Sequence, residues 1–165
     1  MSQDFATADL CDIFENQVLS CQTQFRQFGG RHVFSGRIRT VESLADNVLL
    51  RRLLETHSDG DVAVVDGSGR LGCALMGDVL AGIGIKNGWS GVVIYGAVRD
   101  VNAMEKLDFG VKALGSNPRK SGKNGTGRMD VQVAFGGVTF TPGHWIYCDD
   151  DGILVSEKKL EPSRA

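Results

Sequence analysis

Residues 61–66 (DVAVVD) and 91–95 (GVVIY) decide the fold, and one helix lies in the segment that joins them. Both are short apolar runs rich in β-branched residues, which predicts strands that are buried on both faces. Between them, Gly67-Ser68-Gly69 turns the chain, and residues 77–87 have the spacing of a helix that ends at Gly88. This mixture of strand and helix predicts an α/β protein.

The rest of the chain extends this pattern in both directions. We expect a short helix from residue 7, with Thr7 as its N-cap, and further helices over residues 46–57 and 101–107. The expected strands are residues 32–41, 111–115, 131–135, 138–140, 145–148 and 153–156. No linker or repeat interrupts this order, so we expect a single domain over residues 1–165.

Length and charge exclude several classes of protein. The chain has 165 residues and a formal net charge of −2, which gives no reason to expect direct binding of nucleic acid. No stretch approaches the roughly 18 consecutive apolar residues of a membrane helix, so we expect no contact with a membrane. The first residues lack the basic and then apolar profile of a signal peptide. These observations predict a soluble, cytoplasmic protein.

Residues 117–128 (NPRKSGKNGTGR) form a basic, glycine-rich loop, which we expect to be the mobile segment of the domain. Gly122-Lys123 does not complete a P-loop, because Asn124 replaces the required Ser or Thr. The loop is either a solvated segment or a contact for an acidic partner.

Two further motifs have simpler interpretations as turns. Residues 67–72 (GSGRLG) match the dinucleotide-binding fingerprint, but the predicted helix begins only at Gly77 and the acid, Asp66, precedes the glycines. We therefore predict a tight turn, and reject a methyl-transfer function that would rest on this motif alone. Residues 149–152 (DDDG) have contiguous acids, unlike a calcium loop, and predict a hairpin turn.

An acid followed by twenty residues and an Arg-Asp pair is the strongest indication of chemistry in the chain: Asp78, Arg99 and Asp100. Arg99 is suited to binding a carboxylate with two hydrogen bonds, and Asp100 offers oxygen ligands to a divalent cation. Free N–H groups in the first helical turn after Gly77 would form an anion site. The alternative is that Asp78 only caps a helix and that Arg99 and Asp100 form a surface ion pair.

With these residues the chain resembles the family that contains regulator of ribonuclease activity A and the class II 4-hydroxy-4-methyl-2-oxoglutarate aldolases. The resemblance runs through nearly the whole chain. Its main stretches are residues 6–12 (ATADLCD), 64–67 (VVDG), 74–78 (ALMGD), 87–93 (NGWSGVV), 96–100 (GAVRD), 135–138 (FGGV) and 151–156 (DGILVS).

The resemblance implies a β/β/α swivelling-type domain with a central mixed sheet and flanking helices, assembled as a homotrimer. It implies that the backbone N–H groups of Gly77, Asp78, Val79 and Leu80 hold the pyruvyl part of a small 2-oxo acid. It further implies that Arg99 binds the substrate carboxylate and that Asp100 holds Mg²⁺ or Mn²⁺. Asp78 would steer a water that takes the proton of the C4 hydroxyl. The same site would decarboxylate oxaloacetate, because both reactions pass through the enolate of pyruvate.

Two departures from the aldolases favour the other branch of the family, a regulator that binds and inhibits ribonuclease E without chemistry. Ala103 stands where the aldolases have Glu or Asp, and Glu105 faces a different side of the expected helix. The chain also ends at Ala165, without the C-terminal acid of longer aldolases. The intact Gly77–Leu80 segment and the Arg99-Asp100 pair favour the aldolase, which is the function that we prefer from the sequence.

Overall fold

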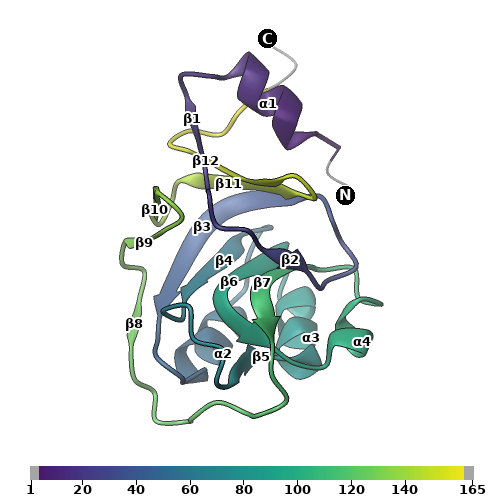
Figure 1. Cartoon of the computed structure of the whole chain (residues 1–165), viewed down its shortest axis with the longest axis vertical. Helices are drawn as coiled ribbons and strands as arrows, with labels where there is room; N and C mark the ends of the chain where they lie inside the picture. The colour runs from purple at the N-terminus through teal and green to yellow at the C-terminus, as the bar shows by residue number, and fades with distance from the viewer. Residues whose placement is uncertain (1–3, 162–165) are drawn as a thin grey trace.

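Strand β4 (Val62–Asp66) lies at the centre of the sheet, between and parallel to β3 (Phe34–Glu42) and β6 (Gly91–Val98). The computed structural model of the protein describes residues 4–161 (Figure 1). The first four residues of β4 are inaccessible to solvent because both faces of the strand are covered. This explains why residues 62–65 (VAVV) are a continuous apolar run, without polar alternation.

The main sheet of residues 4–161 has the strand order β1-β12-β11-β3-β4-β6-β7-β2, with β5 paired to β6 and β8 paired to β3. The remaining strands of this sheet are β1 (Val18–Ser20), β2 (Arg26–Gln27), β5 (Ala74–Met76), β7 (Gly110–Ser116), β8 (Arg128–Met129), β11 (Trp145–Asp149) and β12 (Gly152–Ser156). Strands β3, β4, β6 and β7 are parallel to one another, whereas the pairs β1–β12, β12–β11, β11–β3, β3–β8 and β7–β2 are antiparallel. The predicted α/β class with a central mixed sheet is therefore confirmed.

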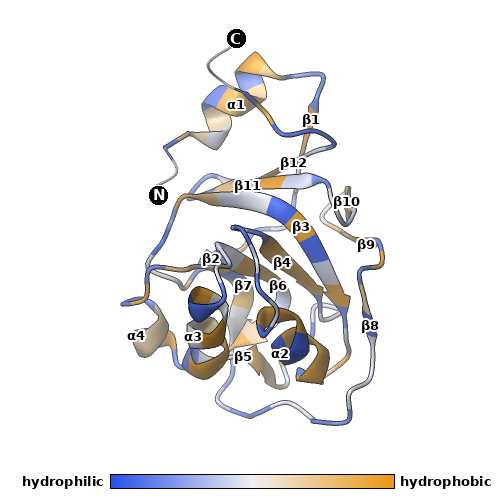
Figure 2. Ribbon diagram, turned by 180° about the vertical axis from the view of Figure 1, so that it is seen from behind, coloured by the Kyte–Doolittle hydropathy of each residue, from blue (hydrophilic) through white to orange (hydrophobic). Residues whose placement is uncertain are grey.

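Helices α2 (Val48–Leu54), α3 (Asp78–Lys86) and α4 (Val101–Met104) cover one face of the parallel strands (Figure 1). Ala63 and Val65 of β4 point into the core beneath these helices. Figure 2 shows the apolar colour of β4 and β6, together with apolar segments of α2 and α3. Since the burial of one aliphatic side chain contributes about 1.5–3 kcal/mol, the apolar side chains on this face stabilise the packing of the helices on the parallel strands.

The opposite face of the parallel strands forms a second core. Val62 and Val64 of β4 point into it, and β9 (Val133–Phe135), β10 (Val138–Phe140), β11 and β12 supply the facing side chains. Helix α1 (Thr7–Ile13) packs on a third cluster, which includes Leu10 and residues of β11 and β12. The chain thus has a layer of antiparallel strands, a layer of parallel strands and a layer of helices (Figure 1).

Most of the predicted elements are present with small shifts of their ends. The helix predicted over residues 46–57 is shorter, and four strands were not predicted: β1, β2, β5 and β8. The prediction of Thr7 as an N-cap is wrong, because Ala6 occupies that position. The Thr7 hydroxyl instead donates a 2.6 Å hydrogen bond to the Asp149 carboxylate on β11, which ties the helix to the sheet.

Among the described residues, no helix combines the length and the apolar character needed to cross a bilayer.

Candidate active site

Arg99 and Asp100 follow directly on β6, at the carboxyl end of the parallel strands. Strand β5 extends this edge, since Ala74 and Met76 pair with the last residues of β6. The N–H of Arg99 donates a 2.9 Å hydrogen bond to the carbonyl of Met76, which fixes the Arg-Asp pair beside the start of α3. The carboxyl ends of parallel strands are where α/β proteins commonly bind ligands.

The Asp100 carboxylate lies against the N-terminus of α3. Its Oδ2 accepts a 3.1 Å hydrogen bond from the N–H of Asp78. A Cβ built on Gly77 would collide with the same carboxylate and would come within 3.3 Å of the Arg99 Cγ. Asp100 itself has a left-handed backbone, with φ 59° and ψ 41°. Strained residues of this kind are concentrated at functional sites.

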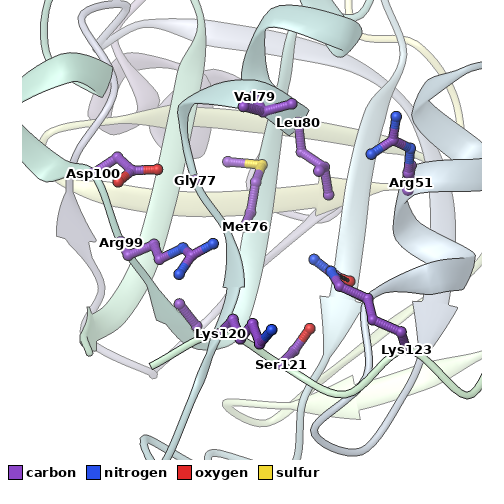
Figure 3. Close-up of a pocket in the computed structure, with 12 residues that line it drawn as sticks. Arg51, Met76, Gly77, Val79, Leu80, Arg99, Asp100, Lys120, Ser121 and Lys123 are labelled. Atoms are coloured by element: carbon purple, nitrogen blue, oxygen red, sulfur yellow. Dashed lines mark hydrogen bonds between the residues drawn. The ribbon is translucent and has the colours of Figure 1, made fainter. Parts of the chain in front are cut away.

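A pocket of about 210 Å³ opens between this edge and the basic loop (Figure 3). Five of the predicted site residues contribute to its lining: Gly77, Val79, Leu80, Arg99 and Asp100. A pocket of this size suits a small organic acid, since drug-sized ligands occupy about 300–1,000 Å³. Arg99 and Asp100 also line an adjoining hollow of about 290 Å³ with Val101 and residues 116–118. The two side chains therefore form a wall that two hollows share.

Asp78 is the predicted site residue that the structure separates from the others. It is exposed in the first turn of α3 and does not contribute to the lining of the pocket. Its backbone N–H, rather than its carboxylate, is the group that contacts Asp100. The steering of a catalytic water by Asp78 stays a prediction, and such a role would act from the rim of the pocket.

Sequence reasoning did not assign five residues that line the opposite part of the pocket: Asn47, Arg51, Lys120, Ser121 and Lys123. Asn47 and Arg51 come from the start of α2, and the others come from the basic loop. The loop approaches α2 because the buried carboxylate of Asp46 accepts hydrogen bonds from the N–H groups of Val48, Asn124 and Gly125.

Further contacts hold the first half of the basic loop in place. The carbonyl of Arg119 accepts a 2.8 Å hydrogen bond from the N–H of Ala74, the first residue of β5. The N–H of Gly122 donates a 2.8 Å hydrogen bond to the carbonyl of Ala45. These are the contacts of an anchored segment, whose mobility stays a prediction. The loop forms one wall of the candidate site.

The charge of the pocket favours an anionic ligand. Four cationic side chains line it (Arg51, Arg99, Lys120 and Lys123), whereas Asp100 is the one acidic side chain among the lining residues. Arg99 donates one terminal N–H to the carbonyl of Pro118 at 3.3 Å and remains exposed to the pocket. The first-turn N–H groups of Val79 and Leu80 add donors, because they have no acceptor within the helix.

Asp100 is the residue that fits a divalent cation at this site. Within residues 4–161, no cluster of three or more His, Cys, Asp or Glu side chains forms a ready-made metal cage. One carboxylate is compatible with Mg²⁺, which usually keeps several waters and is completed by oxygens of the substrate. The donor set therefore fits a cation whose remaining ligands are waters and oxygens of a bound molecule.

The two motifs interpreted as turns are confirmed as turns. The N–H groups of Gly67 and Gly69 both donate 3.1 Å hydrogen bonds to the carbonyl of Tyr95, so they are not available to a phosphate. Residues 149–152 form the hairpin between β11 and β12, where Asp149 pairs with Gly152. The glycine turn leads into β5 rather than into a helix.

Several known proteins resemble this chain over nearly its whole length. A protein of Aromatoleum aromaticum, whose name assigns it provisionally as a 4-hydroxy-4-methyl-2-oxoglutarate aldolase, is 53% identical over 157 residues. That match covers 95% of this chain and 99% of the relative.

Two solved structures superpose on the fold, each with a TM-score of 0.93. One is named S-adenosylmethionine:2-dimethylmenaquinone methyltransferase from Geobacillus kaustophilus; it is 46% identical and covers 94% of this chain and 97% of its own. The other is the RNA-processing inhibitor RraA from Thermus thermophilus, which is 38% identical and covers 99% of both chains. A family model described as RraA-like (Aldolase/RraA) matches residues 7–155. The chain therefore belongs to the RraA-like family.

Proposed function

We propose that the protein is a divalent-metal-dependent aldolase that cleaves 4-hydroxy-4-methyl-2-oxoglutarate to pyruvate, with oxaloacetate decarboxylation as a side activity of the same site. The observation that carries the proposal is the shared pocket of Arg99, Asp100 and the first turn of α3. A relative that is 53% identical and bears the aldolase name supports the choice of substrate.

The cleavage requires that the C4 hydroxyl lose its proton, that the C3–C4 bond break, and that the electron pair move toward the 2-oxo group. The resulting enolate of pyruvate then takes a proton from water at C3, so that both products are pyruvate. Arg99 would bind the C1 carboxylate and hold the 2-oxo acid in one orientation. The N–H groups of Val79 and Leu80 would donate to the pyruvyl oxygens. A cation held by Asp100 would supply Lewis acidity at the 2-oxo oxygen when bound. Asp78 would orient the water that accepts the C4 hydroxyl proton.

Oxaloacetate is a reasonable second substrate because its decarboxylation needs the same stabilisation of charge on a 2-oxo oxygen. The bond that breaks is C3–C4 in both reactions, and the carbon fragment that keeps the 2-oxo group is pyruvate in both. The site needs no additional group for this reaction beyond those that hold the pyruvyl part.

Methyl transfer is not proposed, although one similar structure carries that name. The glycine turn uses its N–H groups for hydrogen bonds to Tyr95, and the pocket of about 210 Å³ is smaller than the range for drug-sized ligands.

A regulator of ribonuclease E is the second candidate function. It is supported by the 38% identical RNA-processing inhibitor and by the exposed Ala103, which replaces the aldolase acid. A regulator that docks through the basic loop would use Arg119, Lys120 and Lys123, of which Lys120 and Lys123 also line the pocket. Arg119 and Arg128 are the exposed cations of the loop outside that lining, and Arg128 is paired with Glu42. Arg119→Ala would weaken a complex with ribonuclease E, and unchanged affinity would count against docking through the loop.

Pyruvate release distinguishes the two functions. The purified protein is mixed with 4-hydroxy-4-methyl-2-oxoglutarate or oxaloacetate, first with Mg²⁺ and then with excess EDTA. The aldolase proposal expects release with Mg²⁺ that EDTA abolishes and that Arg99→Ala lowers roughly 10²–10³-fold in kcat/KM, as for loss of a preorganised charged donor. Release that never exceeds the protein-free rate would favour the regulator.

A further inference from the structure

Lys123 lies across the pocket from the groups that would hold the pyruvyl part of a substrate. In Figure 3, Arg99 and Asp100 are on one side of the pocket, Lys123 and Arg51 are on the opposite side, and Met76 lies between them. A ligand held by Arg99 and the first turn of α3 would therefore extend its far end toward the basic loop. Lys123 would contact the chemical group at that far end.

Asn47 fixes the direction of the Lys123 ammonium. The Lys123 Nζ donates a hydrogen bond to the side-chain oxygen of Asn47, which is only 7% exposed. The amide nitrogen of Asn47 donates a 3.0 Å hydrogen bond to the carbonyl of Leu75, so the Asn47 side chain is held at both ends. A lysine has three N–H donors, and this arrangement leaves two of them for a ligand.

Arg51 is a weaker candidate than Lys123 for binding the far end of the ligand. Its Nε donates a 3.0 Å hydrogen bond to Glu55 one turn along α2, and its side chain is 55% exposed. Its charge is therefore partly compensated and screened by solvent. Lys123 is oriented by a neutral amide instead, so its positive charge is not cancelled by a neighbouring acid of the pocket lining.

The charge of the pocket favours a ligand with more than one negative group. Four cations and one acid line the pocket, and a divalent cation on Asp100 would increase the positive charge further. A single carboxylate bound by Arg99 would leave most of this charge without a counter-charge. A second carboxylate at the far end of the ligand would bind Lys123 and reduce the imbalance.

We propose that Lys123, oriented by Asn47, binds the second carboxylate of the substrate and makes the site selective for 2-oxo dicarboxylic acids over 2-oxo monocarboxylic acids. This inference rests on the proposed function and extends it from the pyruvyl part to the far end of the ligand. Lys123 is a specificity residue in this scheme, because it contacts a group that takes no part in bond cleavage.

Binding of two unreactive acids tests the assignment. 2-Oxoglutarate and 2-oxopentanoate have the same chain length and differ in the terminal carboxylate. Their affinities are measured by calorimetry, with Mg²⁺, for the wild type, Lys123→Met, Lys123→Arg and Lys158→Met. The last is a matched control, because Lys158 is exposed near the C-terminus, away from the pocket lining. We expect the wild type and Lys158→Met to prefer 2-oxoglutarate by roughly 10- to 100-fold, the usual range for a charged hydrogen bond.

Lys123→Met should lose that preference while its affinity for 2-oxopentanoate changes less than about threefold, and Lys123→Arg should recover part of it. A wild type without preference, a preference that survives in Lys123→Met, or an equal loss of both ligands would each overturn the assignment. Pyruvate release from 4-hydroxy-4-methyl-2-oxoglutarate is followed in the same samples. If the binding preference depends on Lys123 but no pyruvate is released, the dicarboxylate subsite stands and the proposed aldolase reaction fails.

Discussion

Gly77 leaves the space that the Asp100 carboxylate occupies. The backbone at Gly77 is extended, with φ −136° and ψ −159°, so the position does not need glycine for its conformation. A Cβ at this position would collide with Asp100 Oδ2, which accepts the N–H of the next residue, Asp78. Glycine is required here for close approach rather than for backbone freedom.

The first prediction follows from this contact. Gly77→Ala should displace the Asp100 carboxylate and lower Mg²⁺-dependent pyruvate release by roughly 10²-fold, by analogy with the loss of one preorganised electrostatic group. Gly82→Ala is the matched control, because it lies in the same helix and a Cβ there meets no atom within 4 Å. That control should retain activity and gain up to about 1 kcal/mol of stability from helix propensity. Equal activity of the two variants would show that the contact is unimportant.

Asp46 anchors the basic loop, and its replacement gives the second prediction. Its buried carboxylate accepts N–H groups from α2 and from residues 124–125. Asp46→Asn should lower the free energy of unfolding by roughly 1–3 kcal/mol and accelerate hydrogen exchange at Asn124 and Gly125. Asp12→Asn, at an exposed position of α1, should change stability by less than about 0.5 kcal/mol. Unaltered exchange in the loop would contradict the anchoring role.

The attachment of α1 to the sheet should depend on pH. Burial acts to raise the pKa of Asp149, but hydrogen bonds from the Thr7 hydroxyl, Thr7 N–H and the hairpin N–H groups outweigh it, so the pKa lies below its ordinary value of 3.8. A lowered carboxyl pKa contributes stability that is present above the ordinary value and is lost as the pH falls through the folded-state value.

Thr7→Val tests this contribution, since it removes the hydroxyl donor at nearly constant shape. It should destabilise the protein by roughly 1–2 kcal/mol near pH 7, because the lost bond is to a charged acceptor. Urea unfolding near pH 7 and near pH 2 should show that the difference from the wild type narrows in acid. A difference that is the same at both pH values would mean that the ionised carboxylate is not the partner that matters.

A homotrimer is predicted from the family resemblance, and the particle mass in solution tests this prediction. Sedimentation equilibrium should give about three times the chain mass of 17.8 kDa. The exposed Val79 at the rim of the pocket, 63% accessible in the single chain, is a residue that a neighbouring subunit would cover. A particle mass near 17.8 kDa across the measured concentrations would contradict the trimer.

The parts of the fold that could be predicted are those with strong local patterns. Residues 61–66 are recognisable as a strand because burial on both faces requires an uninterrupted apolar run, residues 62–65, between the two aspartates. Strand β5 was missed because its three residues run directly into the start of α3, and β1 and β2 are equally short. Pairing with distant strands, rather than local propensity, makes these segments strands.

The candidate site likewise contains residues that local sequence patterns can identify and residues that they cannot. Gly77, Arg99 and Asp100 could be found because they lie in two short motifs at strand ends. Asn47 and Lys123 could not, since their contact joins residues 76 positions apart and depends on the fold of the loop around Asp46. The position of Asp78 was also beyond local reasoning, because a helix-start pattern does not determine which side chains of the first turn face a pocket.

The central claim is that a cation on Asp100 and the guanidinium of Arg99 act on one small 2-oxo acid. Mn²⁺ tests it directly, because a bound paramagnetic ion broadens the ¹³C resonances of pyruvate held beside it. With the wild type we predict broadening that depends on both protein and Mn²⁺, that Asp100→Asn abolishes, and that Arg99→Ala reduces by weakening pyruvate binding. Broadening that is absent in the wild type, or unchanged in both variants, would contradict the claim.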